Sequence, residues 1–366
     1  MENSRDIANE QKSVRSLEFS TRRPPSPLIL VVALLAPQWT LQTSGVNWPL
    51  RGISAVSENV AWASGGPIVV RTATGGDSWQ PMVPDKSKDA VKLDFRDIDA
   101  VDERAAYALS IGRGQLSRIY KTTDAGESWT LQFTNEIPDA FYDAMAFWDA
   151  NRGIAVSDTV AGRFVMVMTE DGGRTWTRIP PERLPSALTN EGYFAASGTN
   201  VAVSGTDHVW AATGAASKAR VLRSTDRGKT WQVSETPIAA GRTAGIFSIA
   251  FRDAQHGIVV GGDYAREGQA VDNVAVTSDG GATWTLVPGT GDAKSPLSGF
   301  RSVVRYIPGT TTVIAVGPSG ADISTDDGMT WARIDGPGFH TFAFAPNGSA
   351  GWGAGSLGRI AKLTGF

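Results

Sequence analysis

The chain has no cysteine among its 366 residues and only three histidines, His208, His256 and His340. The absence of cysteine excludes disulfides, thiolate metal sites and a lipid anchor attached through a thiol. Three histidines scattered this widely do not predict a metal site. The net charge of −3 offers no positive field to nucleic acid or to an anionic membrane. We therefore expect no metal, no cofactor and no nucleic-acid partner.

Long apolar runs and helical periods are scarce as well. Beyond about residue 40, no stretch shows a helical period over roughly ten residues. The apolar run at 28–36 is too short for a membrane span, but it follows a polar stretch that carries Arg15, Arg22 and Arg23. This order is typical of export signals. We predict that residues 1–36 are a leader of the signal-peptide type and that the protein is periplasmic or secreted; the alternative is a disordered tail on a cytoplasmic protein.

One short phrase occurs six times, with the pattern Ser/Thr-x-Asp-x-Gly-x-Ser/Thr-Trp. Its copies end 47 to 55 residues apart, at Trp79, Trp129, Trp176, Trp231, Trp284 and Trp331. The aspartate is present in five copies, as Asp124, Asp171, Asp226, Asp279 and Asp326, and Thr74 replaces it in the first. A repeat of this length indicates that one structural unit is copied along the chain.

The phrase has the chemistry of a tight turn. An Asp side chain accepts hydrogen bonds from backbone amides two or three residues further on, and a glycine two places later supplies positive φ. The tryptophan that follows can fill a gap between sheets. A catalytic site needs one or two carboxylates in one place, not the same carboxylate in every repeat. A single carboxylate per turn also falls short of the ligands that calcium takes. We therefore interpret these aspartates as structural.

Four strand-like runs accompany each copy. In the second repeat they are 95–100, 105–110, 118–121 and 130–133. Four strands in about 50 residues are typical of one β-propeller blade. After the sixth copy the chain adds three more runs, at 339–344, 350–354 and 359–363, and the segment 38–42 resembles the missing fourth. The sequence predicts an all-β, seven-bladed β-propeller over 37–366, with four antiparallel strands per blade and the last blade closed by the N-terminal strand.

A candidate binding site follows from this strand order. The loops that enter each innermost strand, and those between second and third strands, share the face opposite the repeated turns. The long segments 180–190, 261–268 and 288–295 fall there. Aligning the innermost strands gives a column that would ring one mouth of the channel: Arg51, Arg96, Tyr142, Phe194, Phe247, Arg301 and His340. Such a ring suits a carboxylate-bearing group. Alternatively, these residues pair with neighbours such as Asp97, Asp99 and Asp143, or stack between blades.

The phrase is similar to the Asp-box, or BNR repeat, of sialidases, sortilin-type receptors, some glucanases and the photosystem II stability and assembly factor family. Over 38–366 the chain most resembles the last of these, through Phe95-Arg-Asp-Ile98, His256-Gly-Ile-Val-Val-Gly261 and Thr277-Ser-Asp-Gly-Gly-Ala-Thr-Trp284. That resemblance implies a single seven-bladed propeller that holds protein partners without catalysis.

The main alternative is an exo-acting glycoside hydrolase of the sialidase type. Sialidases combine three arginines with a Tyr–Glu pair and an acidic Asp, and Arg51, Arg96 and Arg301 could form such a triad. No Tyr–Glu pair is evident, and Arg178-Ile-Pro180 follows the third tryptophan instead of preceding the first turn. We predict a non-enzymatic, monomeric propeller that binds a protein or peptide through its loop-rich face.

Overall fold

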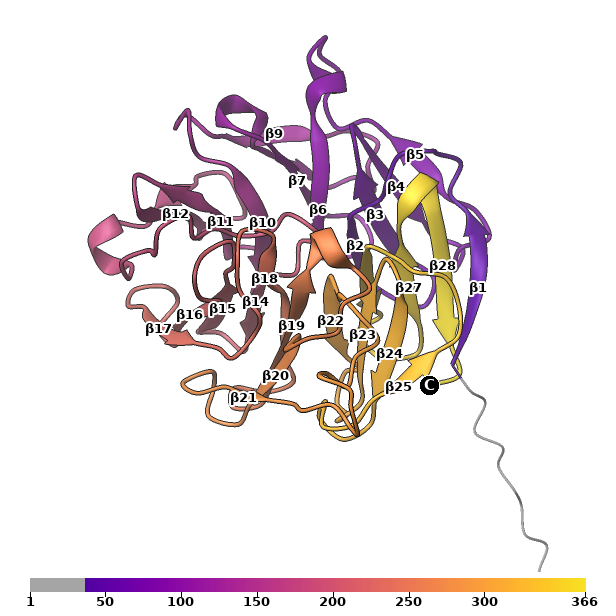
Figure 1. Cartoon of the computed structure of the whole chain (residues 1–366). Helices are drawn as coiled ribbons and strands as arrows, with labels where there is room; N and C mark the ends of the chain where they lie inside the picture. Colours follow the sequence, from indigo (N-terminus) through magenta and orange to yellow (C-terminus); the bar gives the residue numbers. More distant parts are fainter. Residues whose placement is uncertain (1–36) are drawn as a thin grey trace, which may run out of the picture. The chain divides into compact units, whose positions relative to one another are not determined.

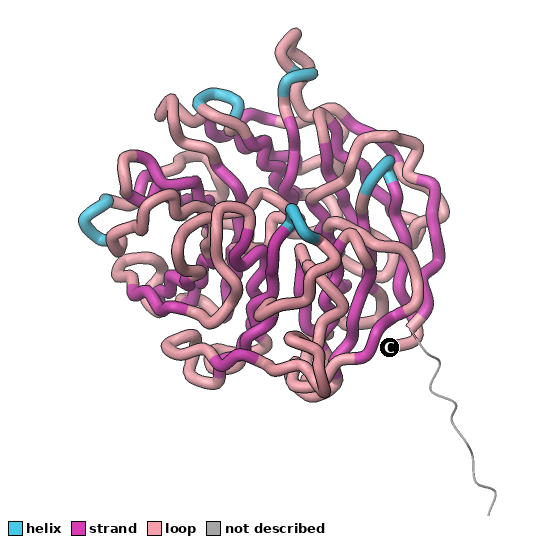
Figure 2. Tube along the Cα trace, viewed as in Figure 1, coloured by secondary structure: helices cyan, strands magenta, loops and turns pink. Residues whose placement is uncertain are grey.

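The computed structural model describes residues 37–366 and contains seven four-stranded antiparallel sheets arranged as the blades of a ring (Figure 1). This confirms the predicted seven-bladed β-propeller. Figure 2 shows that strands and loops form almost all of the described chain. No helix in this part of the chain is long and apolar enough to cross a membrane. The predicted leader at 1–36 lies outside the described residues.

Each of the first six blades consists of four consecutive strands, and the first strand of each is the innermost. Blade 1 contains β2 (Gly52–Ala55), β3 (Ala61–Gly65), β4 (Ile68–Thr72) and β5 (Gln80–Met82). Blade 2 contains β6 (Asp94–Ala100), β7 (Ala106–Ile111), β8 (Arg118–Thr122) and β9 (Thr130–Thr134). Blade 3 contains β10 (Tyr142–Phe147), β11 (Gly153–Val160), β12 (Arg163–Thr169) and β13 (Thr177–Arg178).

The next three blades repeat this arrangement. Blade 4 contains β14 (Val201–Ser204), β15 (His208–Ala212), β16 (Arg220–Ser224) and β17 (Gln232–Glu235). Blade 5 contains β18 (Ala244–Phe251), β19 (Gly257–Asp263), β20 (Val274–Thr277) and β21 (Thr285–Leu286). Blade 6 contains β22 (Val303–Tyr306), β23 (Val313–Gly317), β24 (Gly320–Ser324) and β25 (Ala332–Ile334).

Blade 7 joins the two ends of the propeller chain. It contains β26 (Thr341–Phe344), β27 (Gly351–Ala354), β28 (Arg359–Thr364) and, outermost, β1 (Gln38–Thr43), which pairs antiparallel with β28. Trp39 of β1 packs on Phe339, with ring centroids 4.6 Å apart. The side-chain amide of Gln42 joins β1 to blade 1. Its Nε2 donates to the Gly75 carbonyl at 3.1 Å, and its Oε1 accepts from the Trp79 indole at 3.1 Å. The predicted closure by the N-terminal strand is therefore confirmed.

The repeated phrases form the turns between third and fourth strands. In the second copy, Thr122 Oγ1 accepts from the Gly126 amide at 2.9 Å, and Asp124 Oδ1 accepts from the Ser128 amide at 2.9 Å. The aspartate thus reaches four residues ahead, not two or three as predicted. Gly126 has φ of +91°, as the turn requires. In the first copy the hydroxyl of Thr74 takes over the role of the carboxylate and accepts from the Ser78 amide at 3.0 Å.

The hydrophobic core lies between neighbouring blades. Trp62 of blade 1 is fully buried and meets Trp129 of blade 2 edge-on, with centroids 6.1 Å apart. Phe95 and Tyr120 of blade 2 belong to the same hydrophobic cluster. A fully buried side chain of this size stabilises the fold by about 1.5–3 kcal/mol. The repeated tryptophan therefore fills a gap between sheets, as its position predicted.

One segment departs from the repeat and crosses the channel. Residues 195–199, which we call the plug, precede the short strand β14 and bond to four other blades. The Ala195 carbonyl accepts from Arg96 of blade 2 at 3.2 Å, and Ser197 Oγ donates to the Ser302 carbonyl of blade 6 at 2.7 Å. The Ser197 carbonyl accepts from Thr341 of blade 7, and Thr199 bonds to Ser248 of blade 5. Because 195 and 196 line one cavity and 197 and 198 another, the plug separates the two mouths.

Candidate functional site

The propeller has two chemically different faces. The box face carries the repeated turns and the turns between first and second strands. The loop face carries the connections between blades and those between second and third strands. Within residues 37–366, all five short 3-10 helices lie in loop-face connections: η1 (Ala90–Lys92), η2 (Gly114–Leu116), η3 (Pro181–Arg183), η4 (Tyr264–Arg266) and η5 (Ser356–Gly358). The long segments expected on this face, 180–190, 261–268 and 288–295, are among these connections.

The loop-face mouth of the channel holds a cavity of about 410 Å³, to which every blade contributes. The inner strands supply one lining residue each near their entry, and the plug replaces that residue in blade 4. In the other six blades, the lining residues in or just before the inner strand are Arg51, Arg96, Asp143, Phe247, Ser302 and His340.

Three of these lining residues sit where the inner strand bulges. The pairing register shifts between Phe95 and Asp97, between Tyr142 and Ala144, and between Ile246 and Ser248. The extra residue at each shift is Arg96, Asp143 or Phe247. A bulge adds one residue to one strand and re-aims its side chain. The bulges therefore turn these side chains into the cavity.

The predicted column is only partly assembled in this cavity. Arg51, Arg96, Phe194, Phe247 and His340 line it, whereas Tyr142 and Arg301 do not. Asp143, the residue after Tyr142, lines the cavity instead, and so does Ser302, the residue after Arg301. Since side chains alternate between the faces of a strand, an alignment that slips by one residue selects the wrong face. The alignment of the inner strands is shifted by one residue in blades 3 and 6.

The two displaced residues have structural partners. Tyr142 is 1% exposed and packs edge-on against Phe133, with centroids 5.2 Å apart. Arg301 is fully buried and forms an ion pair with Asp322, with Nε 2.7 Å from Oδ2. Its guanidinium also donates to the Phe300 carbonyl at 2.8 Å. Tyr142 therefore joins blade 3 to blade 2, and Arg301 is held within blade 6, instead of facing the channel.

The two arginines of the cavity differ in how firmly they are held. Arg96 pairs with Asp94, with Nε 2.7 Å from Oδ2, and reaches the plug carbonyl of Ala195. The guanidinium of Arg51 makes no hydrogen bond or ion pair to any described residue. Burial lowers the pKa of Arg51, and the positive charge of Arg96 lowers it further. Arg51 is thus a half-buried cation that faces the cavity without a protein partner.

The opposite wall of the cavity is aromatic. Phe194 and Phe247 stack face to face, with centroids 4.0 Å apart and planes 1° apart. Phe300 and Tyr264 approach Phe247 edge-on, at 4.6 Å and 6.1 Å. Tyr264 remains 48% exposed. This wall can accommodate an apolar side chain beside the cationic groups.

The other titratable groups of the cavity are shifted by burial. Burial lowers the pKa of His340 to about 4, with Arg51 and Arg96 adding to the effect, so its ring is neutral near pH 7. Burial raises the pKa of Asp158 to about 6 and that of Asp143 well above its usual range. The amide of Asp158 also donates to Asp143 at 3.1 Å. Near neutral pH the arginines therefore carry the positive charge of the cavity.

Exposed large apolar side chains are concentrated on the loop face. The structure exposes nine of them, and five belong to loop-face connections: Trp48, Val83, Val91, Tyr264 and Leu357. Three others, Leu41, Leu131 and Val233, are on outermost strands, and Met329 alone is on the box face. Val91 and Leu357 are both 77% exposed. Of these, Tyr264 lines the loop-face cavity, and Trp48 and Val91 line a second pocket that shares Arg51 and Arg96 with it.

The described residues contain no group of three or more His, Cys, Asp or Glu side chains arranged to hold a metal ion. The three histidines lie in different blades, on β15, after β18 and before β26. His208 stacks on Trp210, His256 lies 2.9 Å from Asp253, and His340 contacts Ser356 Oγ at 2.8 Å.

No protein-family model and no curated protein matches this sequence. Solved structures similar to the chain include "YCF48 bound to D1 peptide", with 17% sequence identity and a TM-score of 0.61 over 89% of this chain and 96% of that one. They also include YCF48 from Cyanidioschyzon merolae, at 17% identity and a TM-score of 0.61, over 89% and 98% of the two chains. The GH74 enzyme of Niastella koreensis aligns at 16% identity and a TM-score of 0.54, over 87% of this chain but 43% of its own. At these identities the likeness establishes the shared propeller fold.

Proposed function

We propose that the chain is a non-catalytic propeller scaffold that binds a protein or peptide partner through its loop face. The observation that carries this proposal is a cavity that contains Arg51, an arginine without a protein partner, with exposed apolar side chains at the cavity and at an adjoining pocket. Trp48, Val91 and Tyr264 offer contact area, while Arg51 and Arg96 offer charge-assisted hydrogen bonds to an acidic group. One similar structure, YCF48 bound to D1 peptide, gives a precedent for a propeller of this kind that holds a peptide.

The cavity also contains the carboxyls of Asp158 and Glu267, so an acidic group of the partner would bind at Arg51 and Arg96, beside the apolar wall. His340 is neutral near pH 7 because its pKa is about 4, so Arg51 and Arg96 provide the attraction. The stacked pair of Phe194 and Phe247 lies on the same cavity surface. The proposal also includes a monomeric state, and export through the basic and apolar order of residues 1–36.

The experiment is capture of partners from the native host by cross-linking and mass spectrometry. We expect Tyr264→Ala and the double variant Arg51→Gln with Arg96→Gln to reduce recovery of the partner about tenfold or more, since interface anchors contribute at least about 1.4 kcal/mol. Leu131→Ala is the matched control, because Leu131 is 47% exposed but lies on the outer strand β9. Equal loss of the partner with Leu131→Ala, or no loss with the cavity variants, would contradict binding at the loop face.

A glycoside hydrolase is the second candidate, because the same cavity brings Asp143 and Asp158 near two arginines. Glycosidases use a pair of carboxylates on either side of the scissile bond. Here Asp143 is 1% exposed and bonds to the backbone of its partner, so it is poorly placed to reach a sugar. Hydrolysis of sialosides or glucans by the purified chain, abolished by Asp158→Asn, would establish the enzymatic alternative.

A further inference from the structure

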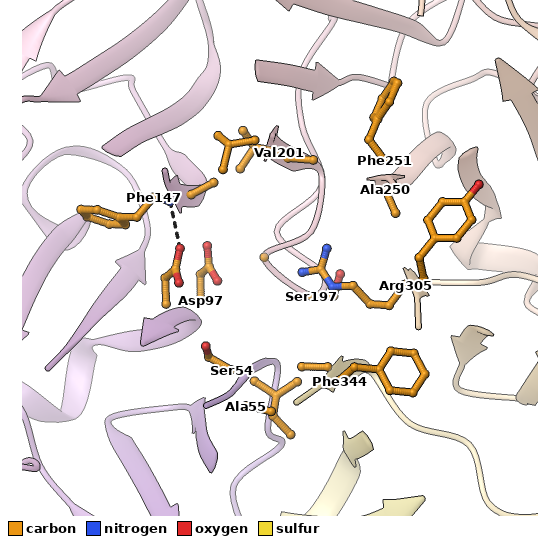
Figure 3. A pocket seen from close by; sticks show the side chains of 18 of the residues that line it. Ser54, Ala55, Asp97, Phe147, Ser197, Val201, Ala250, Phe251, Arg305 and Phe344 are labelled. Carbon is orange, nitrogen blue, oxygen red and sulfur yellow. Dashed lines mark hydrogen bonds between the residues drawn. The ribbon is translucent and has the colours of Figure 1, made fainter. Parts of the chain in front are cut away.

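The box-face mouth of the channel holds a second cavity, of about 510 Å³, which the proposed partner site does not include. The plug separates it from the loop-face cavity. The inner strands of four blades contribute small side chains here, Ser54, Ala146, Ala250 and Ala343. Two other blades contribute charges instead: Asp97 and Asp99 of β6, and Arg305 of β22. Figure 3 shows Asp97 and Arg305 on facing walls of the cavity.

The hydrogen bonds that these two side chains make between blades do not require a carboxyl group. Asp97 accepts from the Met145 amide at 2.7 Å, and Asp99 accepts from the Phe147 amide at 2.9 Å, which joins blade 2 to blade 3. Elsewhere in the ring a neutral hydroxyl serves the same purpose. Ser54 Oγ accepts from the Ala100 amide at 3.1 Å, and Ser248 Oγ accepts from the Val304 amide at 3.0 Å. Blade-to-blade contact therefore does not explain why carboxyls stand here in place of hydroxyls. Burial raises the pKa of Asp97 well above its usual range and that of Asp99 to about 6, so Asp99 carries the negative charge near pH 7.

Each carboxylate also retains an oxygen that is not used by the protein. Asp97 is only 5% exposed, yet its Oδ1 accepts no hydrogen bond from residues 37–366. Gly198 of the plug lies beside this oxygen with φ of +70°, and a Cβ there would collide with it. Asp97 Oδ1 opens onto the cavity and is not fully enclosed, so a ligand or solvent there can supply the donor. The Oδ1 atom of Asp99 is likewise without a donor in the described chain.

Arg305 is the complementary group. Its guanidinium extends into the cavity (Figure 3) and, within the described chain, forms no hydrogen bond and no ion pair shorter than 4.0 Å. The other arginine of this cavity, Arg252, is already held by Asp253 and Asp327. Arg305 is therefore the cation that remains available to a ligand. Its five N–H donors suit the two oxygens of a carboxylate.

We propose that the box-face cavity binds a small zwitterion of the amino-acid class, with its ammonium group at Asp97 and Asp99 and its carboxylate at Arg305. Asp97 and Asp99 are the charged groups that act on Arg305, each from beyond 4.0 Å. Met145, Val201 and Phe251 line the same cavity and fit the apolar part of such a ligand. The cavity volume lies within the range of about 300–1,000 Å³ that is usual for small-molecule sites.

Isothermal titration of the purified chain tests the proposal. The probes are α-amino acids with apolar side chains and the unbranched series from glycine to ε-aminocaproate. Their N-acetyl and amide derivatives, which lack one charge each, serve as ligand controls. We expect binding that requires both charges, with a loss of about 10- to 100-fold in Asp99→Asn and in Arg305→Gln, the range expected for one charged hydrogen bond. Arg178→Gln, on the exposed outer strand β13, should bind as the unsubstituted chain does.

Several results would overturn the proposal. These are no binding by any probe, equal binding of the singly charged derivatives, or binding of neutral sugars in preference to zwitterions. If Arg305→Gln fails to fold, the unsubstituted chain decides the matter through labelling of Arg305 by phenylglyoxal, read by mass spectrometry. Protection of Arg305 by an amino acid supports the site, and identical labelling with and without it contradicts it. Because the loop face is not involved, failure here leaves the proposed partner site intact.

Discussion

The repeated turns show which residues act locally. Each aspartate of the phrase bonds to a hydroxyl and an amide within four residues, so neighbours in sequence satisfy it. The first turn is an internal variant, since Thr74 accepts the equivalent amide bond from Ser78 with a hydroxyl. One acceptor of the right length thus suffices for the turn. The carboxylate adds a second acceptor and a charge.

This comparison predicts the result of substituting Asp279 in the fifth turn. Asp279→Ala removes the acceptor for the Thr283 amide and hydroxyl, at 2.9 Å and 2.6 Å, and should lower the free energy of unfolding by about 1–2 kcal/mol. Asp279→Thr keeps one acceptor and should lose less than half of that. Asp292→Ala, on an exposed loop, is the control. Urea unfolding measures all three, and equal loss in the Ala and Thr variants would show that the charge, not the acceptor, stabilises the turn.

Among the elements, β1 has the role of closing the ring. It covers the edge of β28, which would otherwise present unpaired backbone groups. Trp39 anchors it on Phe339 and Phe342. The equivalence of 38–42 to the strands after each turn was visible in the sequence because the phrase Trp-Thr-Leu-Gln occurs at both 39–42 and 129–132. Closure could therefore be predicted from a local match.

Removing the anchor of β1 should weaken blade 7 first. We expect Trp39→Ala to lower the free energy of unfolding by about 2–3 kcal/mol, below the range for a fully buried tryptophan because Trp39 is half-buried. Leu41→Ala on the same strand should change it by less than about 0.5 kcal/mol, since Leu41 is 65% exposed. Hydrogen exchange should accelerate in β28 before β15. Uniform acceleration around the ring would mean that β1 does not stabilise blade 7 separately.

The inner strands mark the limit of prediction from the sequence. Blade number, strand order and turn positions follow from a pattern that repeats, so they could be read directly. The lining of the channel depends on bulges at Arg96, Asp143 and Phe247, and a one-residue bulge leaves no mark in composition. The alignment places Arg301 level with the bulge residues Arg96 and Phe247, but β22 has no such bulge. Arg301 is therefore buried against Asp322 instead of lining the mouth. The plug was also hidden, because its bonds connect residues about 100 positions apart in sequence.

At the scale of the whole molecule, the ring collects charge at its two mouths. Asp158 lines the loop-face cavity and Asp99 the box-face cavity, and burial raises the pKa of each to about 6. His340 shifts in the opposite direction, to a pKa of about 4. The ionised carboxylates are retained at a cost in stability near neutral pH. A ligand or partner that pairs with them would offset this cost.

The linkage between these pKa values and folding predicts how stability depends on pH. A carboxyl whose pKa rises on folding from about 3.8 to about 6 stabilises the fold fully below pH 3.8, and this contribution disappears as the pH rises through 6. The double variant Asp99→Asn with Asp158→Asn lacks it. Its stability relative to the unsubstituted chain should therefore increase by about 4–5 kcal/mol between pH 4 and pH 7, because two carboxyls contribute and each tenfold change in proton affinity is worth about 1.4 kcal/mol. The contribution of His340 to the pH dependence has the opposite sign, but it is present in both proteins and therefore cancels when their stabilities are subtracted. Urea unfolding at a series of pH values measures the effect, and parallel stability curves for the two proteins would show that neither carboxyl titrates in this range.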